Sequence, residues 1–283
     1  ASIGETFGQR SGVLNLGVEG QMLMGAFAAF YLVFLTGNLW LGLLAAVIVG
    51  AAMGLAMAFV TVNLQAQQGI SGIGFYLFGL GMSTLLFQML VGEVETVSGF
   101  SPVEIPVLSN IPILGEIFFS QSILVYGAYL LIPMAWFVLN KTNIGMKVRA
   151  VGENPEAADS LGVSVGGVRY ITVTMGGVMS GVAGASLSIA LLNVFQQNMT
   201  SGLGFIAVAL VYFGGWRPLG VLLGALLFSM VNSLQLWAQV LGLPIPSDIA
   251  VMLPYIVTIV ALVLTMQRVR APSALSKPFE RGG

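Results

Sequence analysis

The residues best suited to bind a small polar molecule fall in two short segments, far apart in the chain. The first, residues 10–21, contains Asn15 and Glu19, which are four apart and are expected to share one helix face. A carboxylate within a membrane span costs about 2.5–3.5 kcal/mol, so it usually faces a bundle interior or a wet cavity. Two interpretations of Glu19 stay open: it lines a solute pathway, or it pairs with Arg10 or caps backbone amides.

The second segment, residues 193–205, gathers amide and aromatic side chains. Amides both donate and accept hydrogen bonds, which suits neutral hydroxylated or heterocyclic solutes, and aromatic rings can stack on a solute ring. Glycines interrupt both segments, as expected where broken helices form a site near the membrane midplane. The alternative for this segment is an ordinary external loop. The candidate pathway residues here are Asn193, Phe195, Gln196, Asn198 and Phe205.

Several kinds of chemistry are excluded by composition. The chain has no cysteine and no histidine, which removes disulfides, thiol and imidazole catalysis and Cys/His metal sites. It also lacks the G-x-x-x-x-G-K-[ST] phosphate loop, so it should not hydrolyse ATP itself. We therefore predict neither a catalytic site nor a metal site nor a cofactor bound by this chain.

The elements that position these residues must lie in a membrane. Of the 283 residues 57% are hydrophobic and only 7% are charged, with a mean hydropathy of +0.96. A soluble domain carries roughly 25% charged residues. At about 20 apolar residues per span, we expect an all-α polytopic bundle of eight or nine spans in one domain, with Gly-broken helices and two related halves. The apolar runs are 13–35, 39–62, 70–91, 123–139, 171–192, 203–213, 219–241 and 249–266.

Charge bias predicts the orientation of the bundle. The connection 92–121 carries four glutamates and no basic residue, whereas the connection 140–170 and the tail 268–283 carry four basic residues each. Cytoplasmic segments are the ones enriched in Lys and Arg. We therefore place 92–121 outside the cell and the other two segments inside. The single domain 1–283 then divides into a first half (1–139), a cytoplasmic segment (140–170), a second half (171–267) and a cytoplasmic tail.

The cytoplasmic connection contains a complete short helix. Asn154 is a good N-cap, Pro155 fits the first helical position, and Gly162 fits the position just past the end. A helix this short is marginal alone in water, so we expect it to dock on something. Its small face (Ala157, Ala158 and Leu161) suits a groove in a partner.

Residues 8–26 closely resemble the opening signature of ABC-importer permeases of the branched-chain amino acid/simple-sugar superfamily, in particular its nucleoside ("simple sugar") branch. Residues 150–162 look like that family's ATPase-coupling segment, residues 198–207 like its second-half signature, and residues 244–255 like its C-terminal span. The stretches cover nearly the whole chain in the right order. The chain departs from the family pattern at Gln197, where Glu is frequent, and at Leu203, where Arg is frequent.

The resemblance implies a permease in the prokaryotic plasma membrane that carries a small polar solute, a nucleoside first of all. It implies a second permease chain, related rather than identical, partner cassettes that bind ATP and Mg²⁺, and an external solute-binding lipoprotein. The family usually has one more N-terminal span. The alternatives are a permease for a simple sugar or another small solute, and an ion-coupled secondary transporter. The coupling residues would be Glu153, Asn154, Pro155, Glu156, Ala157, Ala158, Asp159, Leu161 and Gly162.

Overall fold

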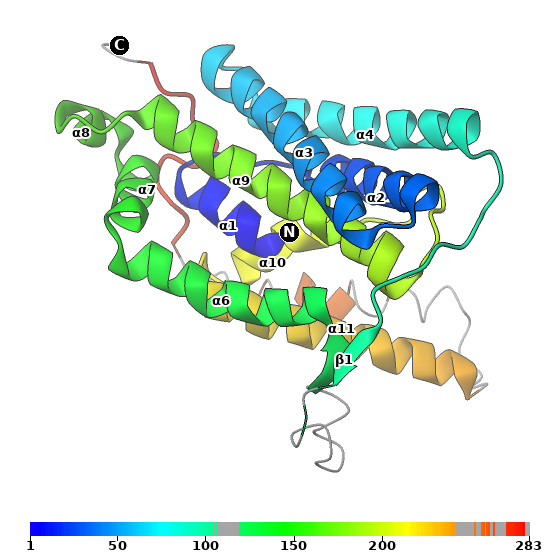
Figure 1. Ribbon diagram of the computed structural model, residues 1–283. Helices are drawn as coiled ribbons and strands as arrows, with labels where there is room; N and C mark the ends of the chain where they lie inside the picture. The colour runs from blue at the N-terminus through cyan, green and yellow to red at the C-terminus, as the bar shows by residue number, and fades with distance from the viewer. Residues whose placement is uncertain are drawn as a thin grey trace.

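The computed structural model is an assembly of helices with one small hairpin (Figure 1). It describes residues 1–104, 106, 119–241, 252, 256–257, 259–260, 263 and 270–280. The helices are α1 (Ser2–Arg10), α2 (Val18–Thr36), α3 (Leu39–Ala58), α4 (Gln68–Leu90), α6 (Ile123–Lys141), α7 (Asn143–Glu153), α8 (Pro155–Ser160), α9 (Val165–Ser186), α10 (Leu203–Phe213) and α11 (Pro218–Val240). Single π-helical turns extend α3 (Phe59–Asn63) and α9 (Leu187–Leu191).

Six of the predicted runs form helices long and apolar enough to cross a membrane. They span Val18–Thr36, Leu39–Asn63, Gln68–Leu90, Ile123–Lys141, Val165–Leu191 and Pro218–Trp237. The run 203–213 forms α10, which is too short to be such a span. The run 249–266 and the family-like stretch 244–255 fall outside the described residues, apart from single positions. The chain is thus a polytopic helical membrane protein.

Helix α9 lies at the centre of the bundle (Figure 1). It packs against α2 and α3 on one side and against the short helix α1 on the other, and α6 and α11 lie beyond α1. The close approach of α9 to α3 depends on glycine, because a Cβ at Gly177 would overlap the backbone of Gly50. The spacing Gly177-x-x-x-Gly181 therefore serves helix packing, as small residues usually do in membrane bundles.

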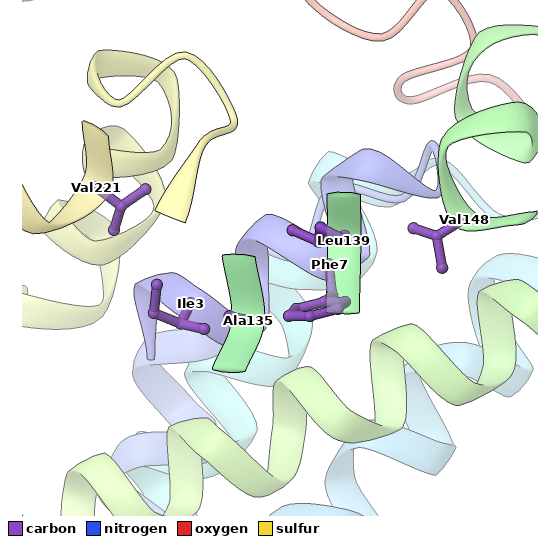
Figure 2. Packing of buried hydrophobic residues seen from close by; sticks show 6 residues of the cluster. All are labelled: Ile3, Phe7, Ala135, Leu139, Val148 and Val221. Atoms are coloured by element: carbon purple, nitrogen blue, oxygen red, sulfur yellow. The ribbon is translucent and has the colours of Figure 1, made fainter. Parts of the chain in front are cut away.

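Helix α1 was not predicted, because its glycines and polar side chains mask an apolar stripe. Ile3 and Phe7 lie on that stripe and are 8% and 4% exposed. Figure 2 shows them packed among side chains of α6, α7 and α11, which are Ala135, Leu139, Val148 and Val221. This cluster fixes α1 within the bundle and so determines where the chain must turn into α2.

The predicted external connection contains the only strands in the described part of the chain. β1 (Pro102–Glu104) pairs antiparallel with β2 (Ser120–Ser122), which leads directly into α6. The two strands are three residues each and leave the helical class of the fold unchanged. They place this connection against the end of α6.

Candidate functional site

The break between α1 and α2 lies where the first polar segment was predicted. α1 ends at Arg10, Gly12 takes a left-handed φ of 93°, and α2 begins only at Val18. Asn15 lies within the break, where its side-chain oxygen accepts a hydrogen bond from the Gly17 amide at 2.9 Å. The expectation that Asn15 shares a helix face with Glu19 is therefore wrong, since Asn15 lies in the break and only Glu19 belongs to α2.

The Glu19 carboxylate joins the two predicted polar segments. Its Oε1 accepts hydrogen bonds from the Thr200 hydroxyl at 2.5 Å and the Gly202 amide at 2.7 Å, and its Oε2 accepts from the Gly204 amide at 2.5 Å. These amides belong to the first turn of α10, where a helix carries unsatisfied N–H groups and a partial positive charge. Glu19 is only 1% exposed, so it caps backbone amides rather than pairing with Arg10.

The contact between α2 and α10 requires a glycine. A Cβ at Gly204 would lie 2.5 Å from the Glu19 Cα atom, a distance that real side chains do not tolerate. Gly204 thus lets the first turn of α10 reach the carboxylate. The glycines of the second segment serve this approach as well as the chain break.

A second buried carboxylate, Glu5, was missed by the sequence analysis. Its Oε1 accepts from the Gln9 side chain at 2.9 Å and the Asn15 amide at 3.0 Å, and Gln9 in turn accepts from the Trp216 indole at 2.8 Å. The Asn15 side chain donates to Gln21 at 3.1 Å, so the network continues into α2. Neutral donors hold both carboxylates. The spacing of Glu5 and Gln9, four apart, was the one signal available beforehand.

The aromatic members of the second segment have different environments. Phe195 is fully buried and packs against Phe27, Phe30 and Phe87, so its ring is covered by protein in this conformation. Phe205 is 37% exposed and meets Tyr76 edge to face, with ring centroids 5.1 Å apart. Only the second of the two predicted rings presents a surface on which a solute could stack.

The amide side chains of this segment also differ in their exposure. Gln196 and Asn198 are exposed on the described chain, whereas Asn193 lies beside a cavity of about 560 Å³ under the β1–β2 hairpin. The Asn193 Oδ1 atom is buried and has no hydrogen-bond partner among the described residues. A buried acceptor without a partner is costly, so Asn193 is suited to accept a hydrogen bond from a solute or a water. Serine side chains line the same cavity, at Ser101, Ser120, Ser122 and Ser186.

The short helix of the predicted cytoplasmic connection forms as expected. It is α8, Asn154 is its N-cap and accepts a hydrogen bond from the Ala157 amide at 3.0 Å, and Pro155 occupies the first helical position. Gly162 follows the helix with a φ of 81°. The local sequence is therefore sufficient to define this helix.

The exposed face of α8 differs in one residue from the predicted docking face. Ala158 is 3% exposed and packs against Val151 and Val165, so it anchors α8 to α7 and α9. Leu161 is 84% exposed, and Ala157 beside it is exposed as well. Leu161 and Ala157 are therefore the apolar side chains of the predicted docking face that remain available for contact with another protein.

The C-terminal tail folds back onto the end of α7 and the break after α1. The Ala274 amide donates to the Gly152 carbonyl at 2.9 Å, at the end of α7, and the Ser276 amide donates to the Gly12 carbonyl at 3.1 Å, in the break after α1. The tail thus connects the helix that precedes α8 with the break that positions Glu19.

Arg169 strengthens this connection. Its guanidinium donates to the Ser11 carbonyl and to the Lys277 carbonyl, both at 3.2 Å. Arg169 was predicted as a basic residue of the cytoplasmic connection, but it is 2% exposed and belongs to α9. Nothing local in the sequence indicates these partners, which lie 158 and 108 residues away.

Apolar helices around a buried polar network, with a break in the chain inside the bundle, are typical of membrane transport proteins. Within the described ranges no group of three Asp or Glu side chains is placed to hold a metal ion. The family described as "Branched-chain amino acid transport system / permease component" matches residues 1–262, and this chain belongs to it. It is a transport subunit and a multi-pass protein of the prokaryotic plasma membrane.

Three relatives match almost the whole chain. A putative glucose ABC transporter permease protein of Haloferax volcanii is 39% identical over 99% of this chain and 93% of its own length. The guanosine ABC transporter permease protein NupQ of Bacillus subtilis is 37% identical over 99% of this chain and 92% of its own. The nucleoside ABC transporter permease protein NupC of Lactococcus lactis is 37% identical over 96% and 90%. No solved structure matches significantly.

Two of these organisms hold a second, more distant permease of the same named solute. NupP of Bacillus subtilis is 27% identical over 86% of this chain and 70% of its own length. NupB of Lactococcus lactis is 24% identical over 78% of this chain and 65% of its own. This chain is therefore more similar to one member of each pair than to the other.

Proposed function

We propose that the chain, residues 1–283, is a single permease domain that forms half of the translocation path of an ATP-driven nucleoside importer. The proposal rests on the similarity, over nine tenths or more of both chains, to permeases named for guanosine and for nucleosides. Partner cassettes would bind ATP and Mg²⁺, and a solute-binding lipoprotein would deliver the solute from outside. The second candidate is a simple sugar, because the relative from Haloferax volcanii is named a putative glucose permease.

For the solute path we infer two kinds of residue. Asn193, Gln196, Asn198 and Phe205 would contact the solute, because they offer amide groups and a partly exposed ring. Glu19 already accepts three hydrogen bonds from protein groups, so its part would be to hold α10 against α2. Asn15 would support it from the break, and Phe195 from the aromatic core.

The partner permease would be a related chain rather than a second copy. The two organisms that hold a permease pair for one named solute support this heterodimer. The coupling segment Glu153–Gly162 would meet the partner cassettes, with Leu161 as the inserted side chain. Movement of the cassettes would then be passed to α7, the tail and the break after α1, and the bundle would alternate between outward and inward openings.

We further propose that the chain has eight or nine spans, with residues 92–121 outside the cell and residues 140–170 inside. Single cysteines at Ser98 and Ser164 should react with membrane-impermeant maleimides from opposite sides, Ser98 from outside. The positions are exposed, and the native chain has no cysteine to react in the background. Labelling of whole cells and of inverted vesicles makes the comparison, and same-side reactivity would refute the orientation.

The solute class is tested by competition. Cells or proteoliposomes that contain the chain with its partner subunits should take up labelled guanosine, and excess unlabelled nucleosides should abolish this uptake while glucose leaves it unchanged. The variants Asn193→Ala and Asn198→Ala should lower the rate, about threefold to tenfold for one lost hydrogen bond each. Uptake of labelled glucose without uptake of labelled guanosine would establish the sugar alternative instead.

A further inference from the structure

Four arginines converge on one cavity at the predicted cytoplasmic end of the bundle. Its volume is about 970 Å³, and it lies where the end of α6, the helix α7, the break after α1 and the turn between α10 and α11 come together. The lining guanidinium groups come from four segments that are distant in sequence, at Arg10, Arg149, Arg217 and Arg270.

The charges of this cavity are not balanced from within. Arg10 donates its Nε to the Trp216 carbonyl at 2.9 Å, and Arg149 donates to the Gly145 carbonyl at 3.4 Å. No carboxylate of the described ranges lies within salt-bridge distance of the four guanidinium groups, although the charge of Glu153 acts on Arg10. The cavity therefore favours an anion that brings several acceptor oxygens, as a phosphate group does.

An apolar groove begins where the arginine cavity ends. It has a volume of about 560 Å³, lies between α6 and α11, and is lined by Tyr129, Ile132, Pro133 and Leu222. Trp136 and Leu219 line both the groove and the cavity, so the two spaces adjoin at these side chains. An indole at such a junction, with an apolar side and a polar side, is typical of the membrane–water interface.

We propose that the cavity and groove together form a binding site for an anionic phospholipid of the cytoplasmic leaflet. The phosphate headgroup would lie among the four arginines, and one acyl chain would occupy the groove between α6 and α11. Basic pockets between membrane helices on the cytoplasmic side bind such headgroups, and charge complementarity selects anionic over zwitterionic lipid. A free phosphate or an acidic protein segment would use the arginines but has no need of an apolar groove.

The bound lipid would brace the halves of the bundle at a specific place. It would touch α6 and α11 through its chain and the break after α1 through Arg10, next to the tail that connects this break with α7. The site depends on the chain being a membrane protein in the proposed orientation, and not on the identity of its solute. Failure of the nucleoside proposal would therefore leave it unaffected.

The test compares lipids that differ only in headgroup. The assembled complex in detergent is titrated with dioleoyl phosphatidylglycerol or dioleoyl phosphatidylcholine, and the affinity is read from the rise of the thermal unfolding midpoint. The preference for phosphatidylglycerol should be at least about tenfold, and Arg149→Gln and Arg217→Gln should each lower it about fivefold. Lys147→Gln, which removes a charge from the exposed face of α7, should leave the preference unchanged.

The groove is tested by a matched pair on α11. Leu222→Trp fills the groove and should weaken the binding of both lipids, whereas Leu223→Trp, at an exposed neighbour outside the groove, should not. Each arginine variant is measured with both lipids, so a variant of lower stability still gives the ratio of the two affinities. The proposal is overturned if the arginine variants keep the full preference, or if inorganic phosphate at the lipid concentration reproduces the stabilisation. The lipid proposal is also overturned if Arg149→Gln and Arg217→Gln release the cassette subunit from the complex but keep the preference for phosphatidylglycerol.

Discussion

Replacement of Glu19 by glutamine should lower both the stability of the assembled complex and its rate of solute uptake. The glutamine amide keeps one acceptor oxygen but turns its NH₂ group toward an N–H or hydroxyl donor of the segment Thr200–Gly204. At least one buried donor then loses its partner, at a cost of about 1–3 kcal/mol. The loss of negative charge at the N-terminus of α10 adds to this cost. The unfolding midpoint and the initial uptake rate should fall together.

Two control variants distinguish the capping role of Glu19 from a general effect of charge and from an ion pair with Arg10. Glu93→Gln removes an exposed carboxylate from the predicted external connection and should change neither quantity. Arg10→Gln should not reproduce the Glu19 defect, because Arg10 donates to Trp216 and not to Glu19. Loss of uptake in a complex of native stability would instead indicate direct contact between Glu19 and the solute. Native behaviour of Glu19→Gln in both assays would contradict the capping role altogether.

The second large effect is expected at α8. Leu161→Asp should lower solute-stimulated ATP hydrolysis of the complex at least about tenfold, because a carboxylate cannot enter an apolar groove without a large desolvation cost. Leu161 is 84% exposed, so its replacement should leave the folding of the chain unaffected. Glu156→Lys, on the same exposed helix, should impair coupling as well.

The measurement is ATPase activity with and without the loaded solute-binding protein, alongside size-exclusion chromatography of the complex. Lys147→Glu supplies the control, because it reverses a charge on the same cytoplasmic surface outside α8. Full stimulation in both the Leu161→Asp and the Glu156→Lys complex would show that α8 is not the coupling element.

Helices and caps were predictable because they depend on neighbours in the sequence. The run 203–213 matches α10 to the residue, and Asn154 and Pro155 begin α8 as their side-chain chemistry requires. The same local signals failed at Asn15, which lies in the break at residues 11–17 and not on the helix that carries Glu19. A glycine signals a possible interruption but does not say on which residue the helix ends.

The remaining parts of the site depend on distant partners. Glu19 meets residues more than 180 positions away, and Gln9 meets Trp216 across 207 positions. The cost of a carboxylate in a membrane span indicated that Glu19 faces the bundle interior or a wet cavity. Whether it lines the pathway or holds protein groups stayed open until the fold was known. The buried role of Phe195 also follows from packing, since a phenylalanine in a polar segment reads equally well as a binding ring.

A second break of the fold, at residues 214–217, follows α10 and lies outside the second polar segment, residues 193–205. α10, like α1, is a short helix that ends in a left-handed turn, with φ of 61° at Gly215 and 55° at Trp216, and a long helix follows. Both turns bring an arginine, Arg10 and Arg217, to the same cavity. This correspondence is consistent with the expectation of two related halves, whose equivalent breaks would be residues 11–17 and 214–217.

Solute uptake through this chain should be driven by ATP hydrolysis in its partner subunits, and an uptake assay with purified components tests this directly. Proteoliposomes are prepared with the permease pair, the cassette subunit and the lipoprotein, and labelled guanosine uptake is followed with ATP or with an imposed ion gradient. We expect uptake that requires hydrolysable ATP, the cassette subunit and the lipoprotein, and that an ion gradient alone does not drive. Uptake that an ion gradient drives in the absence of ATP and of the cassette subunit would show that the chain is a secondary transporter.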